Sequence, residues 1–252
     1  MNKSPDQSKT DEYYTNMFTR NHDTATPYPN IVEARRWAKI SEYLSLISGM
    51  DKTAGETRLR ILDVGCGRGW LVRLASVYGS CDGIDPVAGS IQHAKNMFPD
   101  MNFYTGELPS LIRDPSFIPY DVVVSTEVIE HVVDQDCFVA ALAESLLPGG
   151  YAIITTPRGE MFNNFKKTCD QQPVEKWLSE KELRLLFESH GFSAVARDRV
   201  YDDLPMLSFF HRLCTSRKLA RYMDRMSICC IHKAMQYTTS IYQVWLFRKN
   251  CP

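Results

Sequence analysis

The sequence of 252 residues has no apolar run as long as the roughly 18–20 residues that a membrane span requires. The nearest candidate, residues 228–247, is interrupted by His232, Lys233 and Gln236. The first eleven residues are polar and include no apolar core of the kind that a secretory signal has. We therefore expect a cytoplasmic protein without a transmembrane segment.

Cysteine pairs and a strong net charge are also lacking. The eight cysteines form no C-x-x-C pair and show no metal-ligand spacing, so we expect reduced thiols rather than a zinc site or a disulfide framework. The 29 Lys and Arg residues almost balance the 30 Asp and Glu residues, for a net charge of −1. This balance makes nucleic acid an unlikely partner of the molecule as a whole.

A glycine-rich turn follows a short apolar segment at residues 61–69, ILDVGCGRG. Its G-x-G-x-G spacing differs from the G-x-G-x-x-G of dinucleotide-binding folds and from the G-x-x-x-x-G-K of phosphate loops. Glycine is needed where the backbone adopts positive φ and a ligand comes close. Asp63 precedes the turn and suits a cationic ligand, and an apolar helical pattern follows from Trp70 to Tyr78. The segment predicts a strand, a turn and a helix that bind a nucleotide-like ligand.

The rest of the chain predicts an α/β fold. Apolar segments bounded by turn residues alternate with helical patterns up to Thr156, which favours a parallel sheet with crossover helices. With two later strands, this gives a seven-stranded, mostly parallel sheet with helices on both faces. The predicted strands lie at or end in residues 61–64, 83–86, 102–106, 120–125, 151–157, 192–200 and 241–247.

Two helices have clear boundary signals. Apolar residues at helical spacing predict a helix from Ile31 to Ile47, with Asn30 as its N-cap. A second helix is predicted over residues 179–190, where Ser179 and Glu182 have the spacing of a capping box.

The ordered motifs resemble those of class I S-adenosylmethionine (SAM)-dependent methyltransferases. The resemblance includes the glycine turn, an acid 22 residues after Asp63 at the end of the second strand, and an acid after the third strand. It implies a Rossmann-like sheet, with Asp85 on the ribose hydroxyls and Glu107 near the adenine. The residues expected to bind SAM are Asp63, Gly65, Cys66, Gly67, Asp85, Pro86, Gly106, Glu107 and Thr126.

An acidic triplet follows the fourth strand, at the carboxyl edge where open α/β sheets bind ligands. Glu127, Glu130 and His131 have i, i+3, i+4 spacing, which predicts that they share one face of a helical turn. Such a group suits Mg²⁺ or Mn²⁺, which would lower the pKa of an acceptor oxygen. The alternative is that His131 alone acts as a general base. Both roles stay open from the sequence.

The E-x-x-E-H pattern resembles two branches of the family. One is the ubiquinone-biosynthesis O-methyltransferases, whose motif order is close to that of this chain. The other is the small-RNA 3′-terminal 2′-O-methyltransferases, which use a further histidine downstream. Residues 158–189 contain no histidine, which disfavours the RNA branch.

Three regions are candidates for binding the methyl acceptor. Residues 1–30 are expected to be a mobile N-terminal segment or lid, with Tyr14 and Phe18 at helical spacing, and residues 31–252 to be one methyltransferase domain. Residues 204–248 have seven Lys or Arg against one acid, and a helical insertion between the last two strands is predicted to form an acceptor-binding cap at 204–240. The remaining candidates are Trp177 and the arginines Arg35, Arg36 and Arg68, for which pairing at the surface is the alternative.

These features predict methyl transfer from SAM to a hydroxyl of a small molecule, such as a natural product, a sugar or a phenol. The alternatives are an RNA 2′-O-methyltransferase and an N- or C-methyltransferase of a small molecule. The sequence does not fix the acceptor or the oligomeric state.

Overall fold

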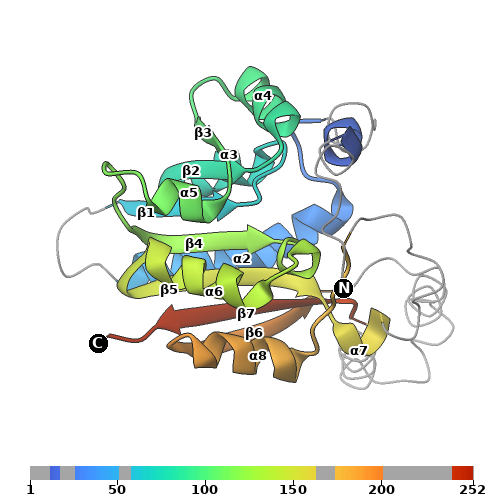
Figure 1. Ribbon diagram of the computed structural model, residues 1–252, viewed down its shortest axis with the longest axis vertical. Helices are drawn as coiled ribbons and strands as arrows, with labels where there is room; N and C mark the ends of the chain where they lie inside the picture. The colour runs from blue at the N-terminus through green and yellow to red at the C-terminus, as the bar shows by residue number, and fades with distance from the viewer. Residues whose placement is uncertain (1–11, 18–25, 51–57, 163–173, 201–239, 252) are drawn as a thin grey trace, which may run out of the picture.

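The computed structural model describes residues 12–17, 26–50, 58–162, 174–200 and 240–251 (Figure 1). Its centre is a seven-stranded sheet with the strand order β3-β2-β1-β4-β5-β7-β6. Only β7 runs antiparallel to its neighbours, which confirms the predicted mostly parallel, Rossmann-like sheet. The strands are β1 (Leu59–Val64), β2 (Gly79–Asp85), β3 (Asn102–Thr105), β4 (Tyr120–Thr126), β5 (Leu146–Pro157), β6 (Phe192–Val200) and β7 (Tyr242–Lys249).

Helices cover both faces of the sheet, as predicted. On one face, α2, α3 and α4 pack their apolar side chains against Ile61 and Val122. On the other face, which is the near one in Figure 1, α5, α6 and α8 pack against Leu62 and Val123. The helices are α2 (Ile31–Met50), α3 (Trp70–Ala75), α4 (Ala88–Met97), α5 (Leu108–Ile112), the 3₁₀ turn η1 (Ile129–His131), α6 (Gln135–Ser145), α7 (Gly159–Phe162) and α8 (Glu180–Ser189). None of the helices in the described ranges is both long enough and apolar enough to cross a membrane.

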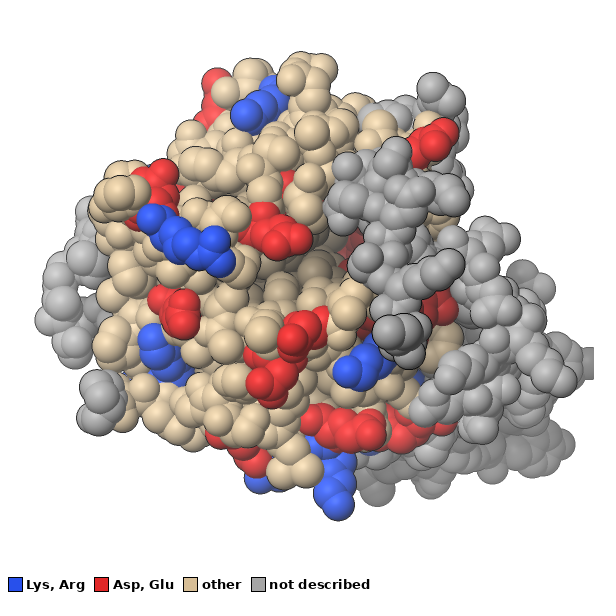
Figure 2. Space-filling model, viewed as in Figure 1, with Lys and Arg blue, Asp and Glu red and all other residues tan. Residues whose placement is uncertain are grey.

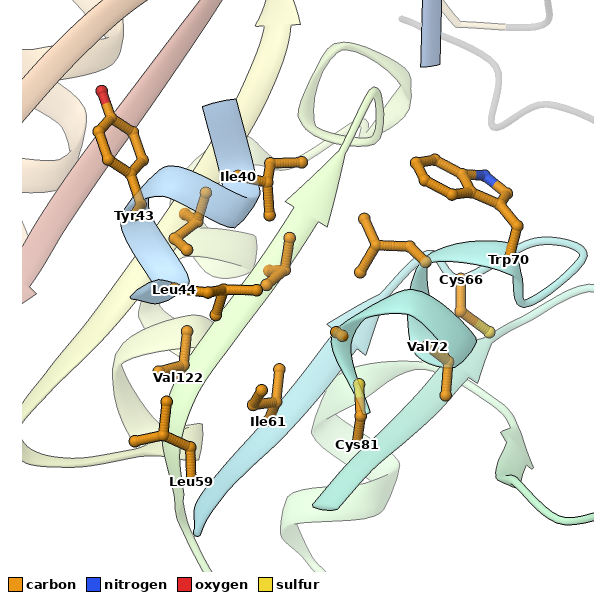
Figure 3. Packing of buried hydrophobic residues seen from close by; sticks show 14 of the residues in the cluster. Ile40, Tyr43, Leu44, Leu59, Ile61, Cys66, Trp70, Val72, Cys81 and Val122 are labelled. Carbon is orange, nitrogen blue, oxygen red and sulfur yellow. The ribbon is translucent and has the colours of Figure 1, made fainter. Parts of the chain in front are cut away.

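Helix α2 begins where its capping residue predicts. The Asn30 Oδ1 accepts hydrogen bonds from the backbone N–H groups of Val32 and Glu33, and the Glu33 carboxylate accepts one from the Asn30 N–H. This reciprocal cap satisfies N–H groups that a helix start otherwise leaves unpaired. Figure 3 shows Ile40 and Leu44 directed from α2 toward the strands, which fixes the helix on the sheet.

The capping box of α8 is confirmed, since the Ser179 hydroxyl accepts from the Glu182 N–H and the Glu182 carboxylate from the Ser179 N–H. Strand β6 has the predicted bounds. Other boundaries differ from the predicted ones, and α2 continues to Met50 instead of ending at Ile47. Strand β5 begins at Leu146, because Leu146 already pairs with Tyr120 ahead of a register shift. Helix α3 ends at Ala75 in a turn, and β7 extends to Lys249.

The carboxyl ends of the parallel strands form the edge of the sheet on which the candidate site lies. Tyr242 pairs with both Pro157 and Val200, so the segment between β6 and β7 leaves and rejoins the sheet at this same edge. That segment contains the predicted acceptor-binding cap, which lies outside the described residues except for Ser240. Phe18 also lies outside them.

Candidate active site

The glycine turn is held against β2 by its own backbone. The N–H groups of Gly65 and Cys66 both donate to the carbonyl of Ile84, at 2.8 and 3.1 Å. Gly65 has a φ of 77°, and a Cβ at this position would lie 2.3 Å from the Val128 Cγ2 atom. Gly67, with a φ of 50°, donates its N–H to Asp85 Oδ2 at 3.0 Å. The positive φ values confirm the predicted conformational need for glycine, and at Gly65 the neighbouring Val128 side chain also leaves no space for a Cβ.

Asp85 links the turn to the next loop. Its carboxylate also accepts the N–H of Val87, and its carbonyl accepts the N–H of Gly106 at 3.0 Å. Asp85 itself is buried, whereas Pro86 and Glu107 are exposed. The structure therefore brings the glycine turn, Asp85 and the loop that holds Glu107 to one edge of the sheet.

Asp63 lies beneath the turn without a partner for one of its oxygens. Its residue surface is only 1% exposed, and its Oδ1 has no hydrogen-bond partner among the residues described. Burial, together with the charge of Asp85, raises the pKa of Asp63 to about 8. A buried carboxylate of this kind is stabilised by a cation or a strong donor.

Arg68 is buried rather than paired at the surface. Its residue surface is 1% exposed, and its guanidinium makes two hydrogen bonds to the carboxylate of Glu33, at 2.6 and 2.9 Å. The remaining donors go to the carbonyls of Thr26 and Tyr28. The pair fastens the glycine turn to the start of α2, so Arg68 is not available to an anionic acceptor.

Glu127 does not share a helical face with Glu130 and His131, contrary to the prediction. It has a φ of 56°, and the 3₁₀ turn begins only at Ile129. Its N–H donates to the carbonyl of Thr155, so the chain continues the pairing of β4 with β5 and then turns sharply. Its Oε1 accepts from the Thr155 hydroxyl at 2.8 Å, and its Oε2 lies 3.2 Å from Nη1 of Arg36.

Arg36, which the sequence offered as a candidate contact for the acceptor, is paired with Glu127 instead. Its side chain is 11% exposed, and its guanidinium lies 4.9 Å above the ring of Tyr242. Burial favours the neutral form, but the carboxylates of Glu127, Glu33 and Glu130 raise the pKa of Arg36 above its ordinary value. Its Nε is buried and has no hydrogen-bond partner within the described part of the chain.

His131 has a fixed tautomer. Its Nδ1 lies 2.9 Å from the carbonyl oxygen of Val174. Because a carbonyl oxygen only accepts hydrogen bonds, Nδ1 holds the proton and Nε2 of the neutral ring has a free lone pair. Burial lowers the pKa of His131, although the bond to Val174 opposes this shift. The ring is therefore neutral near pH 7.

Glu130 lies under the histidine. Its Oε2 accepts from the Thr156 hydroxyl at 2.9 Å, and its Oε1 lies 3.8 Å from the His131 Nε2. Burial, with the charge of nearby Glu127, raises the pKa of Glu130 well above its usual range. Glu130 is therefore a buried neighbour of His131 whose carboxyl is bonded to the Thr156 hydroxyl.

The predicted metal set is not formed. No group of three His, Cys, Asp or Glu side chains in the described ranges is arranged to hold a metal ion. The physical reason is that Arg36 occupies one oxygen of Glu127 and the Thr155 and Thr156 hydroxyls bond the two carboxylates. In this arrangement Glu127, Glu130 and His131 do not fit Mg²⁺ or Mn²⁺.

The segment at 174–178 is fixed against η1. The Lys176 N–H donates to the carbonyl of Glu130, and the Gln135 amide bridges the carbonyls of Ile129 and Lys176. Trp177 follows directly and is half-buried. The structure thus places Trp177 near the triplet, while Arg35 is half-buried on α2.

The short helical segment at 12–17 lies over the same edge. The ring centroid of Tyr14 is 6.3 Å from that of His131, and Thr15 contacts α4 so closely that a Cβ on Gly89 would lie 2.5 Å from it. Burial raises the pKa of Tyr14, with a smaller effect from Tyr13. In Figure 2 this face of the molecule is hollowed near its centre, and acidic side chains lie around the hollow. An acidic border suits a positively charged ligand.

A family model described as a methyltransferase domain matches residues 32–197. The chain belongs to this family. Its sheet order and glycine turn agree with this, and it is a class I SAM-dependent methyltransferase, as the motifs predicted.

The methyltransferase is 31% identical over 154 residues to the bovine mitochondrial ubiquinone biosynthesis O-methyltransferase, a match that covers 54% of this chain and 41% of the relative. The chain spans about half the length of the curated relatives it matches.

Two solved structures share the fold. The N-methyltransferase NodS from Bradyrhizobium japonicum with bound S-adenosyl-L-homocysteine (SAH) has a TM-score of 0.60 at 12% identity, over 95% of this chain and 98% of NodS. The magnesium protoporphyrin IX methyltransferase from Synechocystis with bound SAM has a TM-score of 0.58 at 14% identity, over 99% of this chain and all of that one.

Proposed function

We propose that this methyltransferase transfers the methyl group of SAM to a hydroxyl of a small molecule, with His131 as the general base. The observation on which the proposal rests most is the fixed tautomer of His131, whose Nε2 is left unprotonated near the carboxyl edge of the sheet. The name of the bovine relative, an O-methyltransferase, supports a hydroxyl acceptor.

The donor site offers groups that match SAM. SAM supplies a methyl group on a positively charged sulfur, and its methionine portion has an ammonium and a carboxylate. The unpartnered Oδ1 of Asp63 suits the ammonium, and the unpartnered Nε–H of Arg36 suits the carboxylate. Asp85 lies at the end of β2, where its carboxylate suits the ribose hydroxyls, and the exposed Glu107 lies at the next loop.

The remaining predicted donor residues have lesser roles in this proposal. Gly65 and Gly67 give the donor room to approach the backbone, and Gly106, at a φ of 146°, precedes Glu107 in the next loop. Cys66 is buried against β2, and Pro86 and Thr126 border the site from the ends of β2 and β4.

The proposed chemistry needs one proton acceptor. The Nε2 of His131 accepts the acceptor's hydroxyl proton while the oxygen–methyl bond forms and the sulfur–methyl bond breaks. The products are a methyl ether, SAH and a protonated imidazole that later releases its proton to water. No covalent enzyme intermediate is required.

We further propose that the acceptor presents a planar, hydroxylated ring. Tyr14 places an aromatic ring beside His131, and Trp177 follows the segment that bonds to η1. Aromatic side chains favour planar partners. Arg35 stays a candidate contact for an anionic substituent, and residues 12–17 stay a candidate lid.

His131→Ala tests the general base. We expect kcat to fall by roughly 10²–10⁴-fold, because a positioned base contributes that much, and the dissociation constant of SAH to stay unchanged. In the wild-type enzyme the acid limb of kcat should lie below the ordinary histidine pKa of about 6.5, because burial lowers the pKa of His131. The measurements are steady-state kinetics across pH and calorimetric titration with SAH.

The Glu188→Gln variant is the matched control, because it removes the exposed Arg184–Glu188 pair on α8 and should leave both quantities unchanged. Near-normal turnover in His131→Ala would contradict the general-base role. Methylation of an amine or a carbon, with hydroxyl compounds unchanged, would favour the N- or C-methyltransferase alternative.

A further inference from the structure

Glu127 has a left-handed backbone conformation, which a residue with a Cβ rarely adopts on its own. It is the only non-glycine residue at positive φ in the described ranges, and it lies immediately after β4 at the donor edge. Such conformations persist where the surroundings impose them, and they gather at functional sites. Here the backbone bond to Thr155 and the Thr155 hydroxyl hold the residue from β5.

The conformation aims the Glu127 carboxylate at Arg36. Burial raises the pKa of Glu127, while the charge of Arg36 and the Thr155 hydroxyl favour the ionised carboxylate. The separation of 3.2 Å between Oε2 and Nη1 and the side-chain exposures of 11% for Arg36 and 21% for Glu127 describe a partly buried ion pair. The ring of Tyr242 supports the guanidinium from another side.

Glu127 and Tyr242 hold the Arg36 guanidinium, but its Nε–H group makes no hydrogen bond among the described residues. This Nε–H group is buried. Arg36 follows Glu33 by three residues on α2, and Glu33 is bound to Arg68 of the glycine turn. The guanidinium therefore lies between the glycine turn and the end of β4, and a buried donor there calls for an anionic ligand.

We propose that Glu127 is a positioning residue, which holds the Arg36 guanidinium so that its free N–H binds the carboxylate of the donor's methionine portion. The inference rests on the donor site of the proposed function and deepens it. It assigns Glu127 to donor binding instead of to a metal. The metal role that the sequence suggested for Glu127 needs its carboxylate free, whereas Arg36 and Thr155 use both oxygens.

The test compares two donor analogues by calorimetric titration. SAH keeps the α-carboxylate that corresponds to that of the methionine portion of SAM, and 5′-methylthioadenosine lacks the whole amino-acid portion. In Glu127→Gln the side chain keeps its size but cannot hold the guanidinium by charge. We expect SAH to bind roughly tenfold more weakly or worse, and 5′-methylthioadenosine to bind within about twofold of wild type. The KM for SAM should rise more than kcat falls.

A second variant separates the proposed role from a general effect of the substitution on folding. Glu127→Gly removes the carboxylate and suits the positive φ, so it should give the same difference between the two analogues. The Glu188→Gln control, which removes an exposed Arg–Glu pair, should bind both analogues as wild type does. Thermal unfolding checks that each variant is folded.

Three results would overturn the inference. Unchanged SAH affinity in both variants would show that Glu127 does not act through Arg36. Equal weakening of both analogues would show a structural role only. Binding of Mn²⁺ to the wild-type protein, followed by its paramagnetic resonance and lost in Glu127→Gln, would make Glu127 a metal ligand. If wild-type protein bound no SAH at all, the proposed donor site itself would fail.

Discussion

Replacing Asp63 with Asn should stabilise the donor-free protein at neutral and alkaline pH. Burial and the charge of Asp85 raise the pKa of Asp63 from 3.8 to about 8. The unfolded chain loses this proton near pH 4, so between about pH 4 and about pH 8 the folded state binds more protons than the unfolded state. Wild-type stability therefore falls as pH rises through this window, by about 1.4 kcal/mol per pH unit and by about 6 kcal/mol at most. Asn has nearly the same shape and does not titrate.

The same carboxyl predicts a proton release when the donor binds. The donor's ammonium supplies the missing cation, so Asp63 ionises in the complex. At pH 7 the wild-type protein should release about 0.9 proton on binding SAH, because a group with a pKa of about 8 is mostly protonated there. Asp63→Asn should release none, and it should bind SAH roughly tenfold more weakly or worse, because a charge-assisted bond is lost.

Urea unfolding of both proteins at about pH 5 and about pH 9, without donor, measures the first effect. Titration with SAH in two buffers with different heats of ionisation measures the second. The reasoning is refuted if both proteins show the same dependence of stability on pH, or if the binding heat of the wild-type protein does not depend on the buffer.

Two further substitutions test the glycine turn and its support. Gly65→Ala should lower the free energy of unfolding by about 1–3 kcal/mol or more and weaken SAH binding. The reason is that the new alanine Cβ would lie 2.3 Å from Val128 Cγ2, at a residue whose φ is positive. The control is Gly49→Ala, because a Cβ at Gly49 lies within 4 Å of no atom and the residue lies in helix α2; it should be neutral or stabilising in the same urea assay. Equal loss of stability in Gly65→Ala and Gly49→Ala would contradict this account of the turn. Arg68→Met leaves Glu33 buried without its partner and should cost about 3–5 kcal/mol of unfolding free energy. The double variant with Glu33→Leu should recover much of that loss, and a loss below about 1 kcal/mol in Arg68→Met would show that the pair does not fasten the turn.

Local chemistry explains which parts of the fold were predictable. The caps at Asn30 and Ser179 depend on residues within three positions of each other, and both formed as predicted. The glycine turn was predictable because its alternate glycines meet a requirement of the backbone itself. The start of β5 was not, because it depends on pairing with Tyr120, which is 26 residues away in the sequence.

The site shows the same division between local and distant causes. The spacing of Glu127, Glu130 and His131 predicted a shared helical face, but the bond from Glu127 to Thr155 turns the chain before the helix can begin. The Arg36–Glu127 pair joins residues that no periodic pattern relates. One signal was present for Arg68, since a charged side chain between a buried strand and a buried helix needs a buried partner.

Transfer of an isotopically labelled methyl group tests the central claim most directly. The full chain is incubated with methyl-¹³C SAM and a set of small hydroxylated ring compounds, and the products are analysed by mass and by carbon NMR. We expect a labelled O-methyl product with the wild-type protein and at least about 100-fold less with His131→Ala. A labelled methyl group on nitrogen or carbon, or an O-methyl product formed equally well by His131→Ala, would contradict the account.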